Sequence, residues 1–263
     1  MRKICFGLLG LLFFTACQIR EEITFNDDGS GSYAVGFDLS EMMGMAPATE
    51  NDTVVPQTID TVVVFADFLE EKKDSIATLS KKEQQRLENL RPLRFSMKMD
   101  DSEKKMDMHL SYAFETLDDI DKFAEAIATA DIKELNQTMD PLAGMMGGKG
   151  AKKDSTEKGG LEDIFKMAES FDTRFSKKGF SRKITQDAIA EMAKKKDTSL
   201  KADDPFVDMM RFKQVYHFPY KVKSVSNPNA RILSDFKGVE LEANMYQMNN
   251  DPDYFDIEVA FEK

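Results

Sequence analysis

The clearest structural signal in the chain lies in residues 95–114, which read FSMKMDDSEKKMDMHLSYAF. Apolar side chains alternate with polar ones on both sides of a short acidic turn. The apolar positions are Phe95, Met97 and Met99 before the turn, and Met106, Met108, Leu110, Tyr112 and Phe114 after it. A period of two places these side chains on one face of each strand. We therefore predict a β-hairpin with one buried face and one polar face.

A second hairpin is predicted over residues 19–40, where alternating apolar residues flank a polar turn at 26–31. The turn is rich in Asn, Asp and Gly, which tolerate the backbone angles of tight turns. The acidic residues of the turn also suggest a Ca²⁺-binding loop as an alternative. An EF-hand frame with Gly29 as its sixth residue places Thr24 first and Val35 twelfth, where Asp and Glu are required. This mismatch favours a simple turn.

The remaining pattern predicts helices between hairpins. Residues 41–59 are expected to be irregular, and Pro219 is expected to mark an edge strand or an interruption. Helices are expected at 65–79, 161–168 and 185–195. Another helix is expected to begin at the capping box Ser80–Glu83 and to end at Pro92. Two more are expected to begin at the caps 116–119 and 203–205. Expected strands form a small hairpin at 171–184 and four further segments at 215–225, 230–233, 239–246 and 255–261.

These elements predict an α+β fold, a mostly antiparallel sheet built from hairpins with helices inserted between them. The glycine-rich residues 136–160 are expected to form a flexible insertion. Strands from separate parts of the chain would then complete one sheet. The alternative is two small α+β halves joined through this insertion.

The start of the chain carries a different signal. Arg2 and Lys3 precede the uncharged apolar residues 4–14, and the sequence 15–17 is Thr-Ala-Cys. A helix of eleven residues spans about 16 Å, roughly half of a hydrocarbon core. This length is typical of a signal peptide and too short for a transmembrane helix. The small residues before Cys17 resemble the lipobox of bacterial lipoproteins, although Phe14 replaces the usual Leu.

That resemblance implies a lipid-modified envelope protein. In the lipoprotein family the thiol, here that of Cys17, receives a diacylglyceryl group, the signal is cut before it, and the new N-terminus is often acylated, for example with palmitate. We accordingly expect a signal peptide at 1–16, a lipidated tether at 17–22 and an α+β domain at 23–263, held at the outer membrane. The alternative is an unlipidated signal peptide with an incidental cysteine.

Two further features near Cys17 bear on location. Residues 18–22, Gln-Ile-Arg-Glu-Glu, loosely resemble the acidic signal that directs some lipoproteins to the cell surface, or else are a charged tether. Residues 22–31 resemble the opening hairpin of uncharacterised bacterial lipoproteins. This second resemblance implies an envelope domain and no particular activity.

Composition limits the partners. The formal net charge is −11, and it becomes −13 when Arg2 and Lys3 leave with the signal peptide. Such an acidic chain is unsuited to nucleic acid or to anionic lipid surfaces. The cysteines are Cys5, within the expected signal peptide, and Cys17. We therefore expect a mature domain without a disulfide or a catalytic thiol.

Few residues in the sequence suggest a metal-binding or catalytic role. His109 and His217 have no local partners at metal-ligand spacing. The methionines of the 95–114 hairpin offer thioethers that suit Cu(I), but their alternation equally indicates a core face. The methionines at 42–45 and 145–146 are expected either to form an adaptable contact surface or to pack loosely over the domain.

The sequence favours a non-enzymatic, membrane-anchored binding or structural module of the cell envelope. Its predicted links are to the membrane through covalent lipid and to an envelope protein partner, with no cofactor, metal or catalytic residue assigned. The alternatives are a carboxylate-dependent hydrolase of the envelope and a methionine-based copper-handling lipoprotein.

Overall fold

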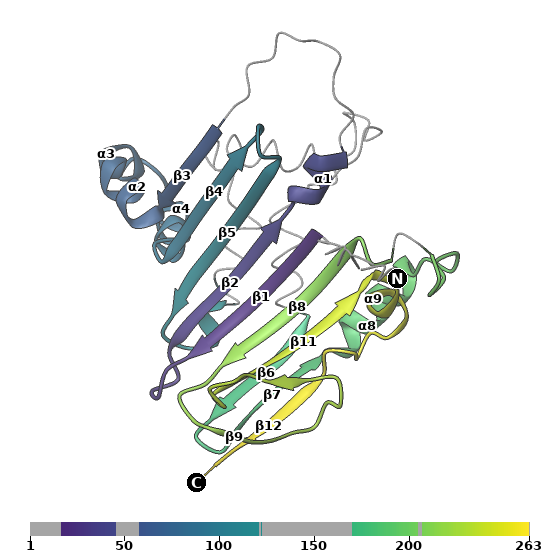
Figure 1. Cartoon of the computed structure of the whole chain (residues 1–263). Helices are drawn as coiled ribbons and strands as arrows, with labels where there is room; N and C mark the ends of the chain where they lie inside the picture. Colours follow the sequence, from purple (N-terminus) through teal and green to yellow (C-terminus); the bar gives the residue numbers. More distant parts are fainter. Residues whose placement is uncertain (1–16, 46–57, 121, 123–169, 205–206, 263) are drawn as a thin grey trace, which may run out of the picture.

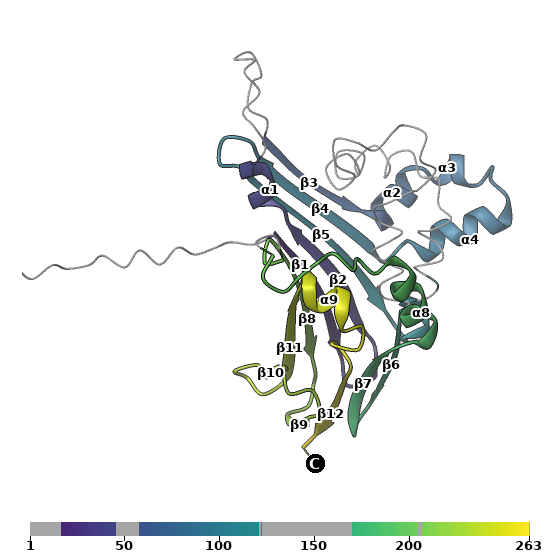
Figure 2. The same ribbon diagram turned by 90° about the vertical axis from the view of Figure 1, so that its right-hand side faces the viewer.

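The computed structural model describes residues 17–45, 58–120, 122, 170–204 and 207–262. Within these ranges the strands form two sheets, with the strand orders β10-β11-β8-β1-β2-β5-β4-β3 and β6-β7-β12-β9. We call them the large sheet and the small sheet. The small sheet faces one half of the large sheet, so that β1, β8 and β11 form a sandwich with it (Figures 1 and 2).

The large sheet contains both predicted hairpins. Its strands are β1 (Cys17–Phe25), β2 (Gly31–Asp38), β3 (Thr58–Val64), β4 (Leu93–Asp100), β5 (Lys105–Phe114), β8 (Met210–His217), β10 (Arg231–Ile232) and β11 (Gly238–Asn244). Among the paired strands that the structure describes, β1 and β8 run parallel and all other pairs run antiparallel. The α+β class is confirmed.

The small sheet combines the predicted 171–184 hairpin with two C-terminal strands. Its members are β6 (Phe171–Ser176), β7 (Gly179–Ile184), β9 (Val222–Val225) and β12 (Ile257–Phe261). Pro219 does interrupt the predicted strand 215–225, and its two parts, β8 and β9, belong to different sheets. The interruption therefore moves the chain from one layer of the sandwich to the other.

Short helices lie beside and between the sheets. They are α1 (Ser40–Met45), α2 (Phe65–Glu71), α3 (Lys73–Ile76), α4 (Lys81–Asn89), α8 (Gln186–Lys195) and α9 (Met245–Asn250). The capping box at the start of α4 is present, because the Ser80 and Glu83 side chains each accept a hydrogen bond from the other residue's backbone N–H. In Figure 2, α8 and α9 lie at the same end of the sandwich.

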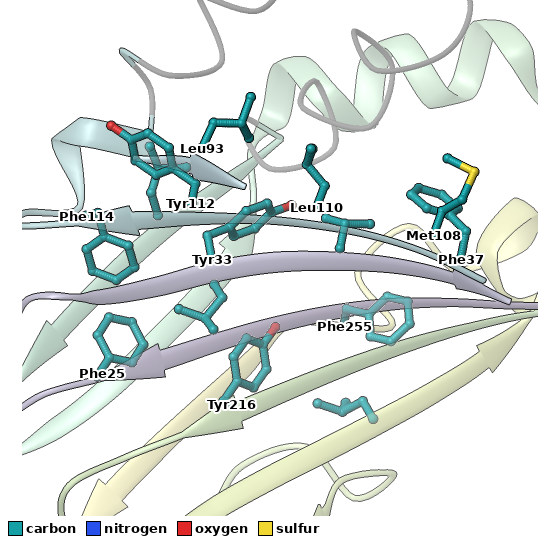
Figure 3. Packing of buried hydrophobic residues seen from close by; sticks show 14 of the residues in the cluster. Phe25, Tyr33, Phe37, Leu93, Met108, Leu110, Tyr112, Phe114, Tyr216 and Phe255 are labelled. Carbon is teal, nitrogen blue, oxygen red and sulfur yellow. The ribbon is translucent and has the colours of Figure 1, made fainter. Parts of the chain in front are cut away.

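One continuous core lies under the large sheet. Its strands contribute alternate residues to this core, as Figure 3 shows for β1, β2, β5 and β8. Phe65 and Leu69 of α2 complete the core on one half. Aromatic rings from both sheets complete it on the other half, where Phe25 stacks on Phe175 with centroids 4.3 Å apart.

Several predictions need correction. Residues 41–59 are not wholly irregular, because they include α1 and the start of β3. No helix continues from the 203–205 cap among the described residues, since 207–209 turn directly into β8. The end of the strand predicted at 239–246 is instead the start of α9. The helix predicted after the cap at 116–119 begins at Asp118. The rest of that prediction, the helix expected at 161–168 and the insertion expected at 136–160 fall outside the described residues.

Candidate functional site

Cys17, the residue expected to carry lipid, is the first residue of β1 and is 5% exposed. Its N–H donates a hydrogen bond of 2.9 Å to the Met209 carbonyl oxygen, and its register partner is Met210 of β8. The tether expected at 17–22 is thus the first part of a strand. Residues 18–22 pair with β2 on one side and with β8 on the other, whereas Cys17 pairs with β8, a distant segment of the chain.

The methionines of the β4–β5 hairpin belong to the core. Met97, Met106 and Met108 are at most 5% exposed, and Met99 packs against the same core. They face one another across the two strands as the pairs Met97–Met108 and Met99–Met106. The core interpretation of this face is confirmed, and these thioethers are not arranged as a copper site open to solvent.

The histidines and the remaining methionines that the sequence analysis considered do not come together in one site among the described residues. His109 is exposed on β5, whereas His217 of β8 has its Nε2 atom 3.2 Å from Glu22 Oε1. Nowhere in the described ranges do three His, Cys, Asp or Glu side chains gather as metal ligands. Met43 of α1 packs against the core, and the 145–146 methionines lie outside the described residues.

The most distinctive site is a cavity of about 910 Å³ at the end of the sandwich where α8 and α9 lie. We call it the methionine cavity. Its apolar wall comes from β6, α8, β8, α9 and the segments that join them, and includes Phe171, Met192, Leu200, Met210, Phe212, Met245, Met248 and Phe255. Its size lies within the range typical of small-molecule sites, and such sites are mostly apolar with a few polar groups.

The rim of the methionine cavity is charged. Asp187, Glu191 and Lys195 of α8 line the cavity and are exposed to solvent, as are Asp197 and Asp251. A hydrogen bond with Asp253, helped by burial and by the negative charge of that residue, raises the pKa of the Asp251 carboxyl. An apolar interior with a polar rim suits an amphiphilic molecule whose polar end stays near water.

Local sequence explains why α8 and α9 close this end. The Thr185 hydroxyl accepts a hydrogen bond of 3.2 Å from Ala188 N and so begins α8 directly after β7. The Asn244 side chain and Gln247 form a reciprocal capping box that begins α9 directly after β11. Polar caps at the strand ends therefore turn the chain into helices whose methionines line the cavity.

A buried polar cluster lies deeper between the two sheets. The Arg182 guanidinium of β7 donates hydrogen bonds of 2.8 and 2.7 Å to the two carboxylate oxygens of Glu21 in β1. Tyr33 also donates to Glu21, at 2.8 Å, and Tyr216 accepts a bond from Arg182 while donating to Gln214. Burial, reinforced by the Glu21 charge, raises the pKa of the Tyr33 hydroxyl well above its ordinary value.

Phe171 separates the polar cluster from the methionine cavity. Its ring lies under the Arg182 guanidinium, 4.4 Å from centroid to Cζ, and also lines the cavity. On the other side Arg182, Tyr33 and Asp172 line a smaller polar cavity of about 230 Å³. The Arg182 Nε atom is buried and has no hydrogen-bond partner in the described protein. Sequence reasoning missed both cavities, because their residues come from elements far apart in the chain.

No family model matches the chain, and no curated protein matches it. A solved structure, the NMR structure of the folded domain of LppM from Mycobacterium tuberculosis, aligns over 96% of this chain and 95% of its own, with 13% identity and a TM-score of 0.33. A likeness at this level establishes neither a shared fold nor a shared function.

No helix in the described part of the chain is both long enough and apolar enough to span a membrane. Two features of the structure bear on function. The methionine cavity can accommodate apolar groups, and the Glu21–Arg182 pair can hold the two sheets together beside it.

Proposed function

We propose that this chain is a lipid-anchored protein of the bacterial envelope that binds an apolar or amphiphilic small molecule in the methionine cavity, without catalysis. The observation that carries the binding role is the cavity itself, about 910 Å³, whose lining includes four methionines and three phenylalanines. The anchor is supported by the signal-like residues 1–16 and by Cys17, which follows them. Attachment at the outer membrane and an envelope protein partner are further parts of this proposal.

The chemistry of the wall supports binding. Methionine side chains are flexible and polarizable, so a methionine-rich wall can adapt to apolar ligands of different shapes. The charged groups sit at the rim and would face water or the polar end of a ligand.

The binding role is tested with the mature chain, residues 17–263, carrying Cys17→Ala and exported behind a conventional cleavable signal peptide. We expect this protein to bind the fluorescent fatty acid cis-parinaric acid. Met248→Trp places a larger side chain in the cavity wall and should lower the affinity at least about tenfold, a loss of about 1.4 kcal/mol in binding free energy.

Val62→Trp is the matched control, because Val62 is 48% exposed on the edge strand β3. It should bind the fatty acid as the parent does, with both variants folded by circular dichroism. Equal affinity in Met248→Trp and Val62→Trp would contradict binding in the cavity.

The anchor is tested separately in cells. Mass spectrometry of the wild-type protein from membranes should show a diacylglyceryl group on Cys17 and cleavage before it. Cys17→Ala should lose that modification and, when exported behind the conventional signal, its retention in washed membranes. Fractionation of inner and outer membranes tests the location. An unmodified Cys17 thiol would refute the anchor and leave the cavity unaffected.

A further inference from the structure

No spacer separates Cys17 from the folded domain, because β1 begins at that residue. Buried residues recur along β1 at Cys17, Glu21, Ile23 and Phe25, with Ile19 on the same side. Glu21 bonds to Arg182 of the small sheet, so this side of β1 faces the interior of the sandwich. The Cys17 side chain therefore lies on the interior face and not on the solvent face.

The register then places Cys17 beside the wall of the methionine cavity. β1 pairs with β8 in parallel without a shift, which sets Cys17 beside Met210 and Ile19 beside Phe212. Met210 and Phe212 both line the cavity. Paired strands lie about 4.8 Å apart and their register partners share a face, so any group attached to the Cys17 sulfur starts next to the cavity wall.

The cavity has room for the two acyl chains of a diacylglyceryl group. A methylene group takes up about as much space as a water molecule, roughly 30 Å³. A volume of about 910 Å³ thus accommodates roughly 30 such groups, enough for two acyl chains of about fifteen carbons each.

We infer that the methionine cavity holds the two acyl chains of the diacylglyceryl group on the Cys17 sulfur whenever the protein is away from a bilayer. The inference rests on the lipidation in the proposed function, and it names the ligand of the proposed site. Exposure of acyl chains to water is unfavourable, and the methionine cavity is an apolar space next to the residue that carries them. In a bilayer the chains insert among lipids, and the cavity becomes open to another amphiphile.

The experiment compares two forms of the full mature chain. One is the lipidated wild type, purified in detergent, freed of detergent and verified by mass spectrometry. The other is the exported Cys17→Ala form described above. Cys17→Ala should bind cis-parinaric acid, and the lipidated protein should bind it at least about tenfold more weakly because its own chains occupy the site.

A second measurement is independent of the probe. Lipidated wild type and lipidated Val62→Trp should elute as monomers without detergent, whereas lipidated Met248→Trp should self-associate because its chains are expelled. Equal probe affinity in the two forms would overturn the inference alone, leaving anchor and cavity intact. An unmodified Cys17 overturns the anchor and the inference together. If Cys17→Ala binds no probe, the proposed binding role fails, and the elution of Met248→Trp against Val62→Trp decides the inference.

Discussion

Glu21 and Arg182 form a doubly hydrogen-bonded ion pair across the two sheets, with N–O distances of 2.7 and 2.8 Å, although they are 161 positions apart in the sequence. Both side chains are almost fully buried, at 2% and 1% exposure. The pair joins β1 to β7 beneath the methionine cavity, so it fixes how the large and small sheets face each other at this point.

Removing one partner of this pair should lower the stability of the fold, whereas replacing both partners by apolar residues should lower it much less. We expect Arg182→Met to lower the free energy of unfolding by about 3–5 kcal/mol, because Glu21 is left buried without its counter-charge. The double variant Glu21→Leu, Arg182→Met should recover most of that loss, since desolvation of both charges is removed. Urea unfolding followed by circular dichroism measures both values.

A surface pair provides the control. Lys105 and Glu103 lie 2.6 Å apart but are 69% and 57% exposed, and exposed ion pairs contribute little to stability. Lys105→Met should leave the unfolding curve nearly unchanged. If Arg182→Met behaved in the same way, the buried pair would have no stabilising role. If the double variant lost as much as the single one, the uncompensated charge of Glu21 would not be the cause of the loss.

The hairpins could be predicted because their signal is local. Strict alternation over 95–114 determined both strands and the face that they bury. The capping box at Ser80 likewise identified the start of α4 from four adjacent residues. By contrast, β3 has only partly buried alternate positions on an edge strand, so its weak apolar pattern merged with the irregular residues before it.

The candidate site could not be predicted, because it depends on contacts between distant segments. Residues 18–22 alone resemble a charged tether, but they pair with β2 on one side and β8 on the other, and Cys17 itself pairs with Met210 of β8. The wall of the methionine cavity combines Met192, Met210 and Met248 from three elements. Only the sandwich of two sheets shows that they are neighbours.

The helix cap at Ser80 offers a local test. Its Oγ accepts a hydrogen bond from Glu83 N, and its N–H donates to the Glu83 carboxylate at 2.9 Å. Ser80→Ala should destabilise α4 by about 1 kcal/mol, because the cap's acceptor is lost. Hydrogen exchange of the α4 amides should accelerate about fivefold, whereas Ser80→Thr should retain near-normal rates. Equal protection in Ser80→Ala would show that the cap does not hold this helix.

Asp256 should make stability depend on pH in a specific direction. Burial raises the pKa of its carboxyl, whose oxygen accepts a hydrogen bond of 2.7 Å from Ile184 N. A carboxyl pKa that is higher in the folded state stabilises the fold below the unfolded value of about 4. That stabilisation is lost as pH rises through the folded-state pKa.

Asp256→Asn removes this titration and keeps an oxygen acceptor for Ile184 N. We expect the variant to be more stable than the wild type at pH 7, with a difference that shrinks as the pH is lowered to about 3. Urea unfolding at several pH values measures the difference. A variant that is less stable at pH 7, or a gap that widens in acid, would show that the charged carboxylate is the favoured form.

Phe171 is expected to be both a wall of the methionine cavity and a support for Arg182. Phe171→Leu keeps an apolar wall but removes the ring under the guanidinium, so it should cost about 1 kcal/mol of stability and leave cis-parinaric acid binding unchanged.

Phe171→Ala also removes the wall between the apolar cavity and the polar cavity at Arg182. It should cost about 2 kcal/mol or more and weaken fatty acid binding about tenfold, because water and the charged pair then adjoin the acyl chain. Unfolding and probe titration on the Cys17→Ala background measure both effects. Indistinguishable Leu and Ala variants would show that Phe171 does not separate the two cavities.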